Sequence, residues 1–100
     1  MVSGDGRHFS DIALDKIIKI AAGYGVSDVY VGRNGLMSTP AISHLIRTLN
    51  EVDEDSCMGA IILTASHNLG GPDGDFGIKL NMSNGAQALE DVTDAIFDYS

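Results

Sequence analysis

The sequence predicts an α/β domain with three layers, in which helices cover both faces of a mixed, mostly parallel four-stranded sheet. Segments with helical spacing of apolar residues alternate with short apolar runs that suit strands. The helices between the first three strands provide the crossovers that parallel strands need. The connection from the third to the fourth strand contains no helix, so we expect that pair to be able to run antiparallel.

The first strand is the opening run, which ends in the turn signal Gly4-Asp5-Gly6. The next segment has a helical pattern, in which we expect Ser10 to cap the helix and Gly23 or Gly25 to end it. One broad face of this helix carries its apolar side chains, namely Phe9, Ala13, Leu14, Ile17, Ile18 and Ala21.

The second strand is predicted at Val29-Tyr30-Val31 and is closed by the turn pair Asn34-Gly35. A second helix should follow, with the Thr39 hydroxyl as its cap and Pro40 at its first position. The stripe that this helix buries consists of Ile42, Leu45, Ile46 and Leu49.

The C-terminal half predicts two strands and one helix. The acidic run Asp53-Glu54-Asp55 is typical of a solvated loop, and a buried strand follows at about residues 58–64. Gly77-Ile78-Lys79-Leu80-Asn81 alternates as the fourth strand, and Asn84-Gly85 then turns the chain. The apolar face of the last helix carries Leu89, Val92, Ala95, Ile96 and Tyr99.

Composition limits the classes of function. The 100 residues form one domain, 44% of them are hydrophobic, and the net charge is -8. This charge argues against a nucleic-acid or membrane surface, and an anionic substrate would need a local cation, a metal or another domain. Cys57 is the only cysteine, which excludes a disulfide within the chain and suits a reducing compartment. We find no signal peptide or apolar span, and we therefore expect a cytoplasmic protein.

The loop that follows the third strand carries the candidate chemistry. Ser66 lies on the first exposed turn, where it is either a nucleophile or phosphate carrier or simply a turn residue. His67 could accept a proton or bind a phosphate, although adjacent side chains rarely form a useful Ser66–His67 dyad. Lys79 could reach back over the loop, or its charge could face solvent. We expect His8 and His44 to be structural or exposed.

Other motifs in this loop fit less well. Asp73 and Asp75 suggest calcium, but Asn84 stands where an EF-hand needs its final glutamate, so turn-building aspartates are favoured. There is no Gly-x-Ser-x-Gly elbow and no P-loop. Three glycines have the spacing of part of a dinucleotide fingerprint but precede a strand rather than a helix, namely Gly71, Gly74 and Gly77.

Residues 64–81, which read Thr-Ala-Ser-His-Asn-Leu-Gly-Gly-Pro-Asp-Gly-Asp-Phe-Gly-Ile-Lys-Leu-Asn, closely resemble the active-site loop of the phosphoglucomutases. This family belongs to the α-D-phosphohexomutase superfamily. The segments Gly4-Asp5-Gly6-Arg7 and Asn34–Ala41 are similar to other parts of the same first domain. The resemblance covers nearly the whole chain.

The resemblance implies a phosphoserine enzyme that interconverts glucose 1-phosphate and glucose 6-phosphate through glucose 1,6-bisphosphate. Ser66 would carry the phosphoryl group, and Ser66, His67 and Lys79 would be catalytic. Ser66, His67, Asn68 and Lys79 would bind the hexose phosphate substrate. Mg²⁺ would bind an oxygen of the Ser66 phosphate, with its remaining ligands outside this chain.

The resemblance also implies that residues 1–100 are an N-terminally incomplete first domain, whose partners are the remaining domains of one polypeptide. We expect this fragment to be inactive alone and to have an exposed sheet edge through which it self-associates. Leu69 stands where the family usually has proline, which predicts a looser loop, and the stretch Asn50–Ser56 is longer than the usual connection.

A second interpretation remains open. The protein could be a non-catalytic phosphoprotein or scaffold relative, like the parafusin-like and aciculin-like members of the family. Retention of Ser66, His67 and Lys79 favours the enzyme.

Overall fold

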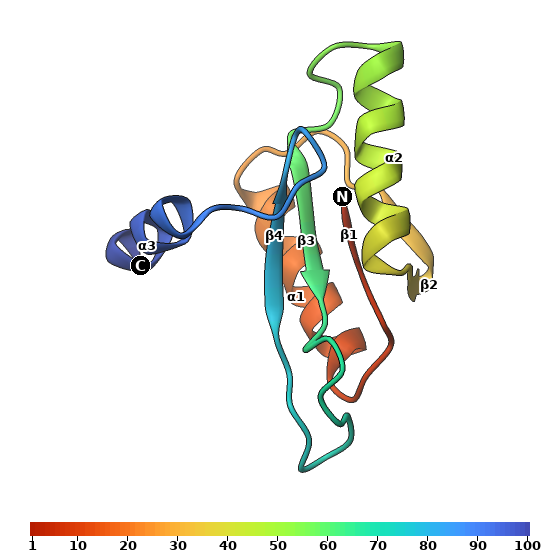
Figure 1. Cartoon of the computed structure of the whole chain (residues 1–100), viewed down its shortest axis with the longest axis vertical. Helices are drawn as coiled ribbons and strands as arrows, with labels where there is room; N and C mark the ends of the chain where they lie inside the picture. Colours follow the sequence, from red (N-terminus) through yellow and green to blue (C-terminus); the bar gives the residue numbers. More distant parts are fainter.

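The computed structural model describes residues 1–100 and contains four strands and three helices in the predicted order (Figure 1). None of the helices has both the length and the apolar character that crossing a membrane requires. The elements along the chain are β1 (Val2–Gly4), α1 (Ser10–Gly23), β2 (Val31–Leu36), α2 (Thr39–Val52), β3 (Gly59–Leu63), β4 (Ile78–Met82) and α3 (Glu90–Tyr99).

The four strands form one mixed sheet in the order β2-β1-β3-β4, which confirms the predicted fold class. β1 is parallel to both β2 and β3, and β3 is antiparallel to β4. The carboxyl ends of β1 and β3 therefore meet at one edge of the sheet, at the lower end in Figure 1. Ligands of open α/β sheets bind at such an edge.

Two helices supply the outer layers. On one face, Ile42 and Ile46 of α2 are fully buried against Ala60 and Ile62 of β3. Burying an isoleucine side chain stabilises a fold by about 1.5–3 kcal/mol, so these contacts anchor α2 to the sheet. On the other face, α1 contacts β1, β2 and β3 and lies behind the strands in Figure 1.

The third helix belongs to neither layer. α3 projects beyond β4 in Figure 1, and none of its residues is buried. The segment that leads to it follows the outer edge of β4, where Ala88 N donates to Leu80 O and Met82 N donates to Ala86 O, both at 2.8 Å. This segment covers part of that edge, while the apolar face predicted for α3 has no partner.

The predicted bounds of the second strand are wrong. Of the predicted residues Val29-Tyr30-Val31, only Val31 lies in β2. Asn34 and Gly35 lie inside β2, with φ angles of 56° and 74°, rather than in a turn that closes it. Val2 pairs with Val31 whereas Gly4 pairs with Leu36, so β2 carries extra residues relative to β1. An Asn-Gly pair favours left-handed backbone, and an irregularity within a strand can use that conformation as well as a turn can.

The predicted helix caps are each displaced by one residue. Phe9, with φ 79°, occupies the N-cap of α1, while Ser10 is the first helical residue and its buried Oγ has no hydrogen-bond partner. Ser38, not Thr39, caps α2, because its Oγ accepts a 3.4 Å hydrogen bond from Ala41 N. A hydroxyl can serve as a cap only where the backbone has not yet become helical.

The end of α1 agrees with the prediction. Gly25 adopts φ 81°, its N–H donates to Ala22 O, and Val26 N donates to Ala21 O. These two bonds form a Schellman motif, which a glycine in the left-handed conformation terminates without steric cost.

Candidate active site

Ser66 lies at the sheet edge where β1 and β3 end. Leu63 at the end of β3 and the following Thr64 are buried, Ala65 is half-buried, and the chain becomes fully exposed at Ser66. A hydrogen bond of 3.1 Å from Asn68 N to Ala65 O closes a tight turn around the serine. Ser66 has φ 58°, a left-handed conformation that is uncommon for residues other than glycine and that concentrates at functional sites.

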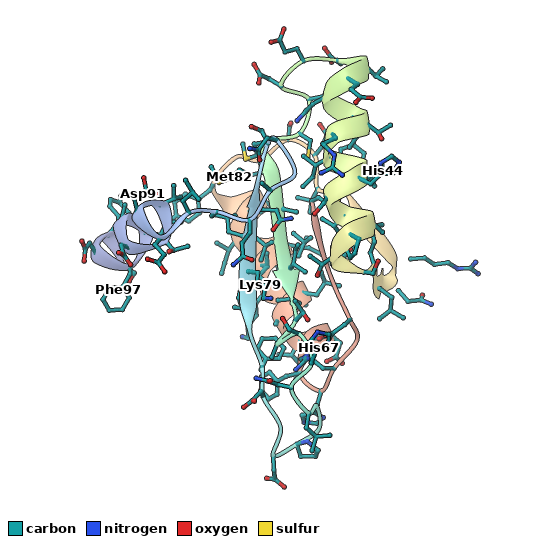
Figure 2. The ribbon with its side chains drawn as sticks, in the orientation of Figure 1. His44, His67, Lys79, Met82, Asp91 and Phe97 are labelled. Atoms are coloured by element: carbon teal, nitrogen blue, oxygen red, sulfur yellow. The ribbon has the colours of Figure 1, made fainter.

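Lys79 reaches Ser66 from the neighbouring strand. Its position on β4 pairs with Ile62 of β3, and its Nζ donates a 2.6 Å hydrogen bond to Ser66 Oγ. Figure 2 shows the Lys79 side chain beside the strands, above the loop that carries His67. Lys79 forms no salt bridge, so its positive charge is available to an anion bound at the serine.

Thr64 holds the backbone beneath the serine. Its Oγ1 accepts a 3.0 Å hydrogen bond from Ser66 N and donates a 2.7 Å bond to the Asp5 carboxylate. The Arg7 guanidinium forms a 2.8 Å salt bridge with Asp5, and its hydrogen bond is the main reason why the pKa of Asp5 falls from 3.8 to about 2. Partial burial opposes this shift, and the Thr64 hydroxyl supports it.

Arg7 connects both arms of the loop. Its Nη1 donates to Asp75 O at 2.7 Å on the returning arm, and its Nη2 lies 3.4 Å from Ser66 O on the outgoing arm. The side chain is only 7% exposed, and its hydrogen bond to Asp5 raises the pKa of Arg7. This guanidinium therefore remains charged beneath the loop.

Sequence reasoning did not assign Asp5, Arg7 or Thr64 to the site. Their place in the chain could have identified Asp5 and Arg7, because Gly4–Arg7 directly follows β1, and β1 is parallel and adjacent to β3. Residues that follow two such strands meet at the same sheet edge, so the segment had to approach the serine loop.

The loop from Leu69 to Gly77 folds back on itself. Asp75 N donates a 2.8 Å bond to Leu69 O, and Phe76 stacks edge-on against Phe9 with the ring centres 6.4 Å apart. A Cβ atom on Gly77 would lie 2.5 Å from Thr64 O, so the two arms approach closely only because this residue is glycine. The closing bond uses the Leu69 carbonyl, which proline would also provide, so the looser loop expected from Leu69 stays a prediction.

The remaining predicted residues lie on the same turn but make fewer contacts. His67 and Asn68 are exposed, and neither side chain forms a hydrogen bond within the protein. No Ser66–His67 hydrogen bond is present, in keeping with the weak case for a dyad. His44 lies on α2, far from the loop in Figure 2, and His8 stacks against Phe9.

No group of three or more histidine, cysteine, aspartate or glutamate side chains is arranged to hold an ion. At the loop, Ser66 offers one oxygen, and the adjacent Lys79 ammonium repels a cation unless a phosphate lies between them. These residues fit at most one ligand position for Mg²⁺, through a phosphate on Ser66.

An apolar cavity lies away from this loop. It measures about 530 Å³ and is lined mainly by apolar residues of α1, of the segment before β2, and of the ends of β3 and β4 remote from Ser66. The serine instead lies on an open edge, where a substrate would need further surfaces to enclose it.

Comparison with known proteins identifies relatives of the whole chain. Residues 1–100 match the family described as phosphoglucomutase/phosphomannomutase, alpha/beta/alpha domain I. The chain is 57% identical over 98 residues to the cytoplasmic phosphoglucomutase of Populus tremula, and 52% identical over 100 residues to phosphoglucomutase 2 of Saccharomyces cerevisiae. The two matches cover 98% and 100% of this chain, respectively. They cover only 17% of the length of each relative.

A solved structure shares the fold. The exocytosis-sensitive phosphoprotein pp63/parafusin (phosphoglucomutase) from Paramecium, in its open form, matches with a TM-score of 0.93 and 55% identity. This match covers 98% of the chain and 17% of the Paramecium protein. The chain belongs to the family of phosphoglucomutase and phosphomannomutase first domains.

Proposed function

We propose that the full-length protein is a phosphoglucomutase, in which Ser66 carries the phosphoryl group. The observation that carries this proposal is the 2.6 Å hydrogen bond from Lys79 Nζ to Ser66 Oγ, on an exposed left-handed turn. The unpaired ammonium is a cation placed where phosphate charge would develop, in a chain whose net charge is -8. The names of the relatives support the same activity.

The proposed reaction consists of two phosphoryl transfers. In the first, the 6-hydroxyl of glucose 1-phosphate attacks phosphorus and the bond from phosphorus to Ser66 Oγ breaks. The hydroxyl proton passes to a base, for which His67 is the candidate, and the leaving Ser66 oxygen takes up a proton from Lys79, which donates to it. The glucose 1,6-bisphosphate then turns round in the site. In the second transfer Ser66 Oγ attacks the 1-phosphate and gives its proton back to Lys79, and the bond from phosphorus to the C1 oxygen breaks. The C1 oxygen takes the proton held by the base, and glucose 6-phosphate leaves. Phosphoryl transfer depends mainly on positioning and charge stabilisation.

The chain's own residues would divide this work. Lys79 would neutralise charge on the phosphoryl group, and Asn68, on the same turn, would help to hold the substrate. Mg²⁺, held by the Ser66 phosphate and by residues outside this chain, would supply further charge neutralisation. We assign the glucose rather than the mannose branch from the Gly-Asp-Phe-Gly-Ile-Lys run.

The remaining proposals concern context. The chain acts as the first domain of a longer cytoplasmic polypeptide, whose other domains complete the site.

The isolated chain self-associates through an open sheet edge. The outer edge of β2 has no strand partner, whereas residues 86–88 follow part of β4. Sedimentation velocity at high concentration should show a dimer or larger species, and a single monomer boundary would contradict this.

Intact-mass measurement tests the central proposal. Incubating the full-length protein with glucose 1,6-bisphosphate should add one phosphoryl group, and Ser66→Ala should abolish the addition. Ser83→Ala, at an exposed serine in the β4 turn, is the matched control and should be labelled like the unsubstituted protein. Labelling that survives Ser66→Ala would place the carrier elsewhere.

A scaffold phosphoprotein is the second candidate, because the similar Paramecium protein is described as an exocytosis-sensitive phosphoprotein. The two candidates differ in turnover. An enzyme should convert glucose 1-phosphate to glucose 6-phosphate and lose label to substrate, whereas a scaffold would keep its phosphate in the presence of either sugar phosphate.

A further inference from the structure

The geometry points to Arg7 as a positioning residue that holds Ser66 in its left-handed conformation and so presents the hydroxyl to Lys79. This inference rests on the proposed function, since it concerns the serine of the same site. A positioning residue is needed because nothing in the local sequence favours a left-handed backbone at Ser66. A serine at φ 58° is strained, and such strain persists only where surrounding contacts over-determine it.

Arg7 supplies those contacts by two routes. The direct route is the 3.4 Å approach of Nη2 to Ser66 O and the 2.7 Å bond from Nη1 to Asp75 O, which hold the two arms together. The indirect route passes through Asp5, which the guanidinium orients. Asp5 accepts the Thr64 hydroxyl proton in a hydrogen bond, and this leaves the Thr64 oxygen free to accept from Ser66 N.

The contacts of Arg7 distinguish it from Lys79. Each of its donor nitrogens is directed at Asp5 or at a backbone carbonyl, and none contacts Ser66 Oγ. Its charge is already balanced by Asp5, and its side chain is only 7% exposed. Arg7 is therefore placed to orient the serine rather than to touch a phosphate.

The Phe9–Phe76 contact supports the same brace. Phe9 has φ 79°, and its ring meets Phe76, the residue after Asp75. The short segment from Asp5 to Phe9 thus contacts the returning arm twice, once by a hydrogen bond and once by aromatic packing.

Arg7→Lys in the full-length protein tests this role. A lysine keeps the charge but cannot bond Asp5 and both carbonyls simultaneously, because it lacks the planar fork. Rapid mixing of dephosphorylated protein with glucose 1,6-bisphosphate, followed by intact mass, yields the rate and the final extent of Ser66 labelling. We expect the rate to fall on the order of 10- to 100-fold, with the final extent unchanged.

The two readouts separate positioning from folding. A purely structural role would lower the final labelled fraction and leave the rate of the folded molecules unchanged, and that result would overturn the inference. Arg33→Lys is the matched control, since Arg33 is exposed on β2 and forms no salt bridge, and it should retain both the rate and the extent.

Hydrogen exchange of residues 64–77 provides a measurement that does not depend on activity. Arg7→Lys should speed amide exchange in this segment relative to Arg33→Lys, because the brace on Ser66 N is lost. Unchanged exchange together with an unchanged labelling rate overturns the inference. If the unsubstituted protein is never labelled, the proposed function fails, and the role of Arg7 is then decided by exchange alone.

Discussion

At the scale of single residues, the site depends on two charged groups with different surroundings. Lys79 is half-buried, unpaired and bonded to the serine hydroxyl, whereas Arg7 is covered and paired with Asp5. The first arrangement leaves charge for a ligand, and the second uses charge to hold backbone. Arg7 follows the end of β1 and Lys79 lies on β4, and both strands reach the serine loop through their place in the sheet.

The depressed pKa of Asp5 predicts a stability change at acid pH. Its folded pKa of about 2 lies below the ordinary value of 3.8, so the ionised carboxylate stabilises the fold above pH 3.8. This contribution is lost as the pH falls through about 2. Because the Asp5 side chain is 36% exposed, solvent screening reduces the effect to about 1 kcal/mol.

Urea unfolding of the isolated domain as a function of pH checks this expectation. The unsubstituted domain should be more stable than Asp5→Asn at neutral pH, and the difference should shrink as the pH falls towards 2. Asp28→Asn is the control, because Asp28 is exposed and forms no ion pair. A stability difference that is constant over this range would contradict the assignment.

At the scale of elements, the two arms of the serine loop are bonded to one another and to a neighbouring segment. Thr64 N donates to Gly77 O at 2.9 Å, which extends the β3–β4 pairing beyond both strands. Arg7 and Phe9 then attach the returning arm to the segment after β1. The position of Ser66 therefore depends on how β1, β3 and β4 pair with one another.

The cap of α2 provides a prediction about an element. Ser38→Ala should destabilise the domain by about 0.5–1 kcal/mol, because Ala41 N loses its side-chain acceptor. The value belongs at the lower end of the range for N-caps, since the bond is 3.4 Å long. Thermal or urea unfolding measures the change, with Thr39→Ala as the matched control. A larger loss from Thr39→Ala would show that Thr39 is the cap.

At the scale of the whole molecule, the domain presents three surfaces without partners. The apolar face of α3 is exposed, and the 530 Å³ cavity on the α1 side is open, while Ser66 lies on an unenclosed edge. The chain spans 17% of the length of the relatives it matches, so a phosphoglucomutase would bring much further structure to these surfaces.

We therefore predict that residues 1–100 alone neither interconvert glucose phosphates nor bind Mg²⁺ tightly. The chain offers one phosphate-bearing oxygen, no metal cluster, and no enclosure that would exclude water from the transfer. A coupled assay for glucose 6-phosphate and calorimetric titration with Mg²⁺ check the two parts, with the full-length protein as the positive control. Turnover by the isolated chain would refute the first part.

Much of the fold could be predicted from local patterns, because those patterns reflect local free energies. The Ile42 and Ile46 stripe predicted a buried helix face, and Gly25 predicted a helix end, and both are confirmed. The cap positions were wrong by one residue because several adjacent residues can each accept a helix N–H. Asn34-Gly35 was misplaced because left-handed backbone suits both a turn and a strand irregularity.

The sequence alone determined the order of strands and helices and the serine loop, since each depends on residues close together in the chain. It also predicted a mixed sheet, from which connections between strands contain a helix and which do not. Only the tertiary structure decided how that loop is held. Arg7 and Asp75 are separated by 68 positions, and Asp5 and Thr64 by 59, and their hydrogen bonds arise where β1 and β3 end side by side. Such contacts depend on the register of paired strands, which no local pattern of residues specifies on its own.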